Sequence, residues 1–188
     1  MNTLRFRIEC HGPLHVATGS SGRGSDLTID ADDILPASSV KGTMRAAARG
    51  LLGLPTPLID VVFGARGTPS PWAWSTPHFS EPPIVRARTR IAIGADGRTI
   101  PQALQRFEEA WAGAGEFTID QSGLIAEDEV TDHITVLLAS AASVKAVGGD
   151  RNRGFGVVQI RPETVGSDSP DTLAQRVVAL RAEGGSHG

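Results

Sequence analysis

The 188-residue sequence contains a single cysteine, no tyrosine and no long hydrophobic run. Cys10 has no partner for a disulfide within the chain, and this cysteine usage is typical of a reducing compartment. One cysteine and five scattered histidines also argue against a structural zinc site. No stretch approaches the roughly 20 apolar residues that a membrane helix needs, and the N-terminus has no signal-peptide core. These absences predict a cytoplasmic protein with no membrane partner.

The chain also lacks a strong excess of charge of either sign. Its 18 basic and 21 acidic residues give a formal net charge of −3, and 40% of its residues are hydrophobic. This composition is typical of a globular protein with enough apolar residues for a core. It excludes a generally basic coat for nucleic acid, so any anion-binding function must come from a local patch. The missing tyrosine removes one common helper of RNA-cleaving sites.

Alternation of apolar and polar residues predicts several half-buried strands. Residues 3–9, TLRFRIE, and 85–93, VRARTRIAI, both follow the two-residue period of a strand. In the second segment, three arginines therefore occupy one face. Further strands are predicted at residues 14–17, 116–125 and 155–160.

Apolar residues at helical spacing predict two long helices and a C-terminal one. In chain order, these are expected from Ser38 or Ser39 to residue 52, over 128–147, and from Pro170 to about 182. Either serine can cap the first helix. Residues 101–112 are compatible with a short helix or a broken one. The order of strand, helix, strands, helix and strand predicts an α+β fold of the ferredoxin-like or RNA-recognition-motif kind.

Residues 147–160, VGGDRNRGFGVVQI, place two arginines among four glycines. A dinucleotide fingerprint opens a helix after a strand, whereas this loop follows a helix and leads into a strand. A Walker loop is excluded because no Gly-Lys-Ser or Gly-Lys-Thr follows. What remains is a loop whose glycines let an extended ligand approach and whose arginines can bind phosphate. A plain turn with solvated arginines is the alternative.

Four motifs, which occur along the chain in the order known from one protein family, resemble that family. The glycine loop, GGDRNRGFGVV at Gly148–Val158, resembles the C-terminal motif of the RAMP superfamily, the backbone subunits of CRISPR effector complexes. LPASSVKGTMRAAAR at Leu35–Arg49 is similar to a second family motif, with Ala37 where glycine is usual. PLHVATG resembles the end of the family's first strand, and RTRIAIG with EEAWAGAGEF resembles the thumb region of type III backbone subunits. The resemblance spans residues 3 to about 162.

The resemblance implies a domain organisation and a set of partners. A RAMP domain is expected over residues 1–165, with a lid segment at about 55–83 and a β-hairpin thumb at about 84–118. Residues 166–188 are expected to form a C-terminal helix and tail. The implied partners are a crRNA guide, complementary target RNA, other CRISPR effector subunits, and copies of the same chain in a filament.

The resemblance also implies which residues contact RNA. Lys41, Arg45 and Arg49 recur every four residues and form a basic stripe on the first helix, where they can contact guide phosphates. Arg49 is left open between this role and solvation. The expected RNA-binding residues are Ser38, Ser39, Lys41, Arg45, Gly148, Gly149, Arg151, Arg153 and Gly154.

The three arginines of the predicted strand at 85–93 are expected to contact the guide–target duplex through the thumb. They are Arg86, Arg88 and Arg90. Three like charges at alternate positions repel each other unless an anion or acidic residues lie opposite. Nucleic acid is one such partner, and acidic residues of a neighbouring subunit, such as the segment Glu127–Glu129, are the other.

The resemblance to type III backbone subunits further implies target cleavage, which in those proteins uses an aspartate in the loop after the first strand and a divalent metal. Asp26 is the matching catalytic candidate here, and Asp30 is its alternative, because the loop spacing departs from the familiar pattern. Mg²⁺ or another divalent ion is the implied cofactor. Loop aspartates also commonly serve as turn residues.

Three readings therefore remain open within the superfamily. The chain is a backbone subunit that positions and also cleaves target RNA, a non-catalytic structural subunit, or a stand-alone endoribonuclease that processes CRISPR RNA. The last would use His11 or His15 as general acid or base, although a structural role is expected for both. A small-molecule enzyme on a ferredoxin-like sheet is a fourth reading, which the lack of a clustered acid–base set opposes.

Overall fold

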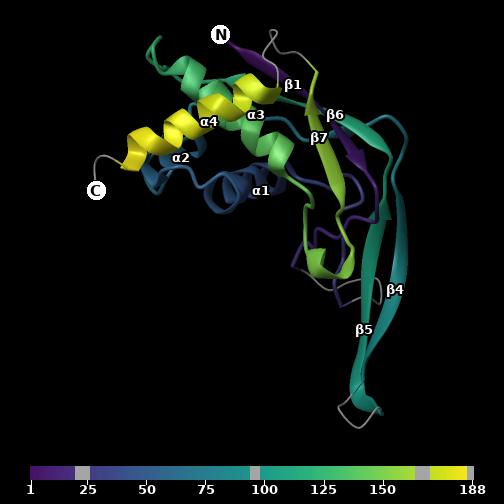
Figure 1. Ribbon diagram of the computed structural model, residues 1–188. Coiled ribbons are helices and arrows are strands. Elements are labelled where there is room, and N and C mark those ends of the chain that lie inside the picture. Colours follow the sequence, from purple (N-terminus) through teal and green to yellow (C-terminus); the bar gives the residue numbers. More distant parts are fainter. Residues whose placement is uncertain (20–25, 94–97, 164–169, 186–188) are drawn as a thin grey trace.

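The computed structural model describes residues 1–19, 26–93, 98–163 and 170–185. Its main sheet has the strand order β2-β6-β1-β7, and a short β3 also pairs with β6. These strands are β1 (Thr3–Cys10), β2 (Trp72–Trp74), β3 (His78–Phe79), β6 (Ala114–Gln121) and β7 (Val158–Pro162). All of the pairings are antiparallel. The fold is the expected α+β class, with helices on one face of the sheet (Figure 1).

The central strand β1 has the alternation that its sequence predicts. Leu4, Phe6 and Ile8 are buried, and the charged residues between them are exposed. Phe6 stacks on Phe117 of β6, with ring centroids 5.1 Å apart. Because the side-chain period of a strand is two, one face of the sheet is apolar and the other polar.

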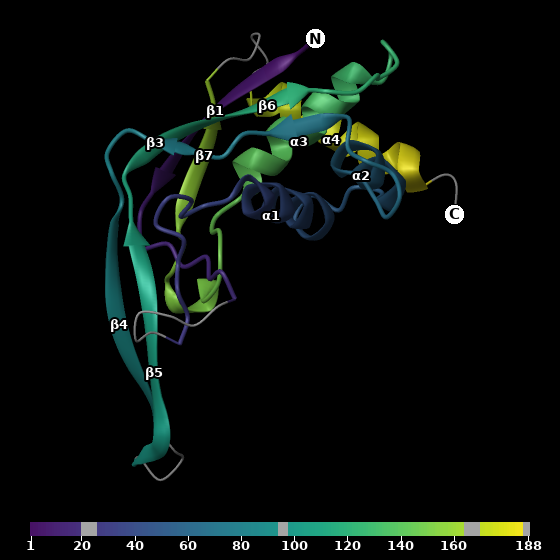
Figure 2. The same cartoon turned by 180° about the vertical axis from the view of Figure 1, so that it is seen from behind.

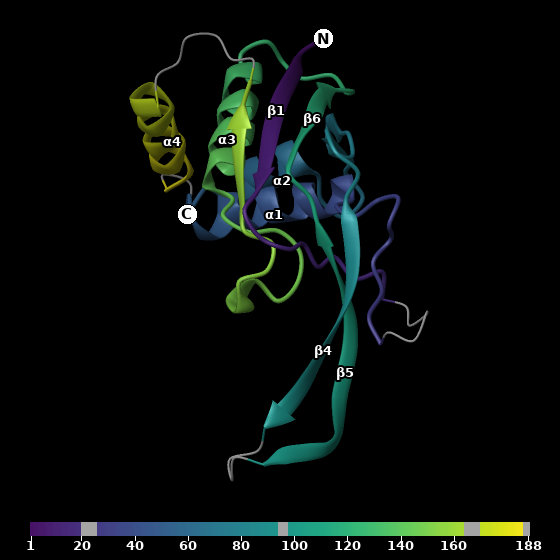
Figure 3. The same ribbon diagram turned by 90° about the vertical axis from the view of Figure 1, so that its right-hand side faces the viewer.

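Four helices cover the apolar face. They are α1 (Ala37–Gly50), α2 (Thr56–Phe63), α3 (Val130–Ser143) and α4 (Pro170–Gly185). Figure 3 looks onto the polar face, with α1, α2 and α3 behind the sheet. α1 buries Val40, Met44, Ala47 and Ala48, which recur at helical spacing. The expected domain boundary near residue 165 lies outside the described residues, while Val177 and Leu180 of α4 join the core.

A second, two-stranded sheet projects away from this body (Figures 1 and 2). It is the hairpin of β4 (Ile84–Ile93) and β5 (Thr99–Trp111). The expectation of a helix at residues 101–112 is wrong. The segment is rich in helix formers, but cross-strand pairing with β4 decides its conformation. Isolated β-bridges of Leu14 to Ala110 and of Leu27 to Phe107 also hold β5 in an extended conformation. Such tertiary contacts override the helix propensity of the segment.

Two other expectations near helix ends are corrected. α1 begins at Ala37 after Pro36, whose extended backbone precedes the helix, and no side chain caps it. Ser38 and Ser39 therefore lie inside the first turn and are not N-caps. α3 ends at Ser143 rather than at residue 147, because Lys145 to Val147 hydrogen-bond instead across the glycine loop to Gly156 and Val158.

The boundaries of three predicted strands also change. Residues 14–17 make only isolated bridges, because Leu14 pairs with Ala110 and Ala17 with Ile29. The last strand begins at Val158, since the preceding residues belong to the glycine loop. The strand expected at 116–125 is β6, which ends at Gln121 where Ser122 and Gly123 turn back to bond Pro71. No described helix has both the length and the apolarity to cross a membrane.

The segment expected as a lid, residues 55–83, supplies α2, β2 and β3, and part of it belongs to the core. Trp72 is buried, and its indole Nε1 donates a hydrogen bond to Nδ1 of buried His133 on α3, at 3.1 Å. Burial lowers the pKa of His133 from its ordinary 6.5, and the charges of Glu129 and Asp132 oppose this in part. The imidazole is therefore held neutral as an acceptor.

This arrangement predicts a pH-dependent term in stability. As the pH falls, the unfolded chain takes up a proton on His133 near pH 6.5, before the folded chain does. The stability that depends on neutral His133 is therefore complete above pH 6.5 and is lost as the pH falls below this value. His133→Asn keeps an acceptor for Trp72 but cannot titrate. In urea denaturation from pH 7.5 to 5, wild type should lose more stability than His133→Asn, and parallel pH profiles would contradict the prediction.

Candidate nucleic-acid interface

The glycine loop docks on the segment that follows β1. The backbone N–H of Gly149 donates to the carbonyl of His15 at 2.8 Å. Gly148 has a φ of +79°, and a Cβ there would lie 2.6 Å from the same carbonyl oxygen. The His15 ring is buried, and its Nδ1 is 2.7 Å from the carbonyl oxygen of Glu108 on β5. His15 is thus a structural residue that joins the loop to the hairpin, as expected for it.

Docking places the loop beside the exposed face of α1. A hollow of about 370 Å³ lies between them, lined by Ser39, Gly42 and Thr43 of the helix and by Gly148, Gly149 and Arg151 of the loop, among others. The two motifs that the sequence singled out, more than a hundred residues apart, therefore meet at one site. Gly42, Ala46 and Gly50 recur every four residues, so one face of α1 carries almost no side-chain bulk.

Two further hollows of about 360 and 300 Å³ adjoin the first, since all three share Ala46. We call the three together the α1 groove. Its cationic lining residues are Lys145 and Arg151 on the glycine-loop side, and Arg45 and Arg49 on α1 itself. No carboxylate occurs among the described residues that line it. The groove is therefore a local positive site on a chain of net charge −3.

Two cations of the predicted α1 stripe are engaged within the protein. Lys41 does not line the groove, because its Nζ lies 4.7 Å from the centre of the Trp74 ring. Burial and then the nearby charge of Arg45 lower the pKa of Lys41. Arg45 pairs with Asp60 of α2 at 2.5 Å and donates to the Gly64 carbonyl at 2.8 Å. Ser38 is exposed in the first turn, outside the groove lining.

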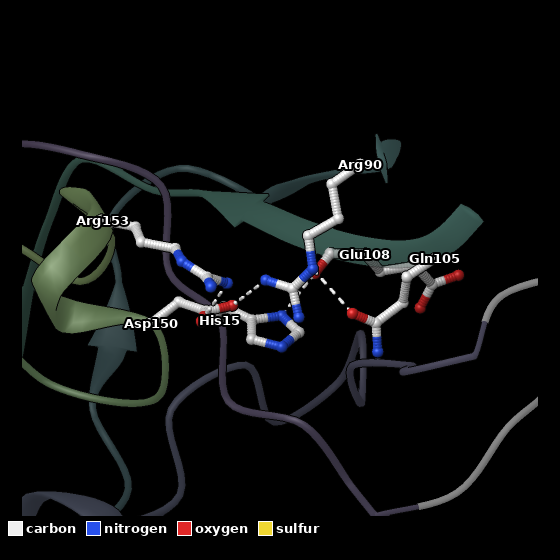
Figure 4. Close-up of polar contacts among 6 residues, drawn as sticks. All are labelled: His15, Arg90, Gln105, Glu108, Asp150 and Arg153. Atoms are coloured by element: carbon white, nitrogen blue, oxygen red, sulfur yellow. Dashed lines mark hydrogen bonds and ion pairs between the residues drawn. The ribbon is translucent and has the colours of Figure 1, made fainter. Parts of the chain in front are cut away.

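The hairpin arginines lie on one face, as the sequence predicts, and two of them have acidic partners within the same chain. Arg88 lies 3.5 Å from Glu109 on β5, and Arg90 lies 2.7 Å from Asp150 of the glycine loop. Figure 4 shows Arg90 between Gln105 and Asp150. The expected acidic partner on a neighbouring subunit is thus not needed for these two. Arg86 faces Glu109 in the strand register and is exposed.

Arg153 and Gly154 lie at the end of the 3₁₀ turn of the glycine loop and are not among the residues that line the groove. Residues Arg151–Arg153 form a 3₁₀ turn, and Gly154 ends it in the left-handed region with a φ of +82°. Arg153 is exposed and lies 3.2 Å from Asp150. Phe155 is buried and packs against Phe107 and His15, so its ring is not available to stack on a base.

Asp26 lies beside β5. One of its carboxylate oxygens accepts the backbone N–H of Arg106 at 2.8 Å, and the residue is exposed. Asp30 instead accepts the N–H of Asp32, as a turn residue does. Within the described ranges, no three His, Cys, Asp or Glu side chains are grouped to hold a metal. The residues near Asp26 therefore fit a divalent ion only in part, because Asp26 offers one carboxylate and RNA oxygens would have to supply the other ligands.

The open face of the main sheet is not a base-stacking platform. RNA-recognition motifs stack bases on sheet aromatics. Here the exposed positions of β1, β6 and β7 are mostly polar or charged, and among the described residues they carry neither Phe nor Trp. Ion pairing of Arg7 with Glu9 is typical of this face. The α1 groove is the better candidate for nucleic acid.

The antiparallel sheet covered by helices on one face is the α+β fold that the order of elements predicted. The sequence profile of the RAMP superfamily matches residues 7–159, so the chain belongs to this superfamily.

Among solved structures, the chain is similar to a subunit of the type III-B Cmr-beta complex bound to cognate target RNA, and to one of the same complex in its apo state. Each comparison has a TM-score of 0.66 at 13% identity and covers 86% of this chain and 97% of the other. At this identity, the likeness shows a shared fold. No curated protein sequence matches significantly.

The docking geometry predicts that two loop glycines differ in their tolerance of alanine. Gly154→Ala should cost about 1 to 2 kcal/mol, the penalty of a left-handed residue, since nothing lies within 4 Å of its Cβ position. Gly148→Ala carries the same penalty and also forces the loop away from the His15 carbonyl. It should therefore be clearly the more destabilising in chemical denaturation. Equal losses would show that the loop is not held against His15.

Proposed function

We propose that this RAMP protein is a guide-RNA-binding backbone subunit of a type III-like CRISPR effector complex. In this role, several copies bind along one crRNA, and each presents its segment of guide to complementary target RNA. Membership of the superfamily and the fold shared with Cmr-beta subunits support the proposal. The observation that carries it is the α1 groove, where four cations and no carboxylate line a surface of very small side chains.

The groove suits a sugar–phosphate backbone for physical reasons. Gly42, Ala46 and Gly50 let a chain of phosphates approach the helix closely, and Gly148 and Gly149 do the same on the loop side. Arg151 and Lys145 can then replace counterions of the phosphates, which favours binding at moderate salt. Arg45 is held by Asp60, which offsets its charge, so the net positive charge of the groove comes from Lys145, Arg49 and Arg151.

The β4–β5 hairpin is proposed to act as the thumb that contacts the guide–target duplex. It projects from the body (Figures 1 and 2). Its exposed residues include both cations and apolar side chains. Ile91 and Leu104 lie opposite each other in the register, and both are more than half exposed. Arg86 and Arg88 lie on the other face. The arginine face fits contact with the phosphate backbone of a duplex, and the apolar face fits contact with a base step.

Copurification tests the assignment most directly. The protein should be produced together with the products of neighbouring genes, and any bound nucleic acid extracted and sequenced. A uniform short RNA with a repeat-derived end is expected. A preparation that stays free of nucleic acid at low salt would contradict the proposal.

Groove contacts predict a defined salt dependence of RNA binding. Arg151→Gln and Arg49→Gln should each weaken binding of single-stranded RNA about three- to tenfold and reduce the slope of log K against log salt by about 0.7. Arg5→Gln removes the same charge from the open face of the sheet and is the matched control. Fluorescence anisotropy over a salt series measures all three. Equal effects of the groove and control variants would show general charge attraction instead.

Asp26 is proposed as the residue that supports target cleavage, with a divalent ion completed by RNA oxygens. When bound, that ion would supply positive charge to the cleaved phosphate. The support is an exposed carboxylate held by the Arg106 N–H beside the proposed thumb.

Asp26→Asn tests this role, because an amide oxygen can still accept the Arg106 N–H. Cleavage by the assembled complex should fall at least about 100-fold while target binding is unchanged. Asp30→Asn is the control and should cleave normally. Wild-type cleavage by Asp26→Asn would show that Asp26 is not the cleaving residue, and wild-type cleavage by both variants would favour the non-catalytic structural subunit.

A further inference from the structure

One carboxylate of the glycine loop holds two arginines from different parts of the chain. Asp150 accepts from Arg90 of β4 through Oδ2 at 2.7 Å and from Arg153 of the loop through Oδ1 at 3.2 Å. Figure 4 shows both guanidinium groups converging on it. Asp150 is the one non-glycine residue of positive φ in the described backbone, at +51°. The loop therefore adopts a costly conformation that aims this carboxylate at the hairpin.

The cluster has the composition of an occupied anion site. Two guanidinium groups facing a single anion are the arrangement with which proteins bind phosphate. Arg90 is further fixed by a hydrogen bond to Gln105 and by the Phe107 ring, 5.1 Å from its guanidinium carbon. Arg90 is therefore positioned by the hairpin itself, while Arg153 is mostly exposed. Asp150, the anion between them, belongs to the loop, as does Arg153.

The site adjoins the α1 groove. Asp150 lies between Gly149 and Arg151 in the sequence, and both of these line the groove. A strand of nucleic acid in the groove can thus bring its next phosphate to the two arginines.

We propose that Asp150 is a specificity-determining residue that occupies the place of a phosphate and excludes small anions. This inference rests on the proposed RNA-binding function of the groove. The carboxylate is tethered, so a free phosphate ion or a mononucleotide must compete with a high effective concentration of it. A strand already bound in the groove presents its phosphates at a comparable effective concentration and displaces the carboxylate. Asp150 then discriminates a polynucleotide from its fragments.

Asp150→Asn tests the inference, because asparagine tolerates a left-handed backbone and removes only the charge. Two probes are titrated against wild type and variant: inorganic phosphate, followed by the NMR signals of the arginine Nε–H groups, and a long fluorescent oligouridylate, followed by anisotropy. The variant should bind inorganic phosphate about fivefold more tightly, as expected for the loss of a competing ion pair worth about 1 kcal/mol. Its affinity for the long RNA should change less than about threefold.

Controls separate this idea from a structural role and from the function itself. Asp150→Asn with Arg153→Gln should lose the gain for phosphate, and Asp150→Gly, which also suits a positive φ, should reproduce it. Thermal melting verifies that each variant folds. If neither Asp150 variant gains affinity for phosphate, the inference is wrong, even where wild type binds RNA. If phosphate affinity rises but no variant binds RNA, the proposed function fails and Asp150 remains a competitor for small anions.

Discussion

The hydrogen bond from the Gly149 N–H to the His15 carbonyl is the contact on which the candidate site depends. It holds the glycine loop against the segment that follows β1. A side chain at Gly148 would collide with the His15 carbonyl and prevent this close approach. Because the His15 ring also contacts the Glu108 carbonyl of β5, the same point connects the loop to the hairpin. Loop and hairpin therefore share one buried anchor, and the hollow between the loop and α1 depends on the loop position that this anchor fixes.

The positions of the cationic side chains in this protein depend on individual ion pairs and not on an overall excess of basic residues. The chain has more acidic than basic residues, yet no carboxylate occurs among the described lining residues of the α1 groove. One groove cation, Arg45, and the hairpin residue Arg90 each have an acidic partner that fixes the direction of the side chain. Arg45 with Asp60 stabilises the contact of α1 with α2, whereas Arg90 with Asp150 joins the hairpin to the loop. Partly exposed pairs of this kind contribute little to stability, so their main effect is on geometry.

The α1 groove, the candidate site, does not lie on the sheet face that RNA-recognition motifs use to stack bases. A fold of the RNA-recognition-motif kind suggests the open sheet face, but that face carries ion pairs such as Arg7 with Glu9 and no described Phe or Trp. The small side chains Gly42 and Ala46 make the opposite, helical side approachable instead. The shared fold therefore does not by itself locate the binding surface, and local side-chain size and charge decide it.

Local pattern determined the α+β class, the strand period of β1 and the importance of the glycine loop, because these follow from side-chain periodicity and glycine content within a few residues. The same reasoning missed β5, since helix-forming residues there are held as a strand by pairing with β4. It also missed Lys145 and the small-residue face of α1, and it could not see that Asp150 binds Arg90. Asp150 and Arg90 are 60 positions apart, and Lys145 is still further from α1, so only the docking of the loop on His15 brings these residues together.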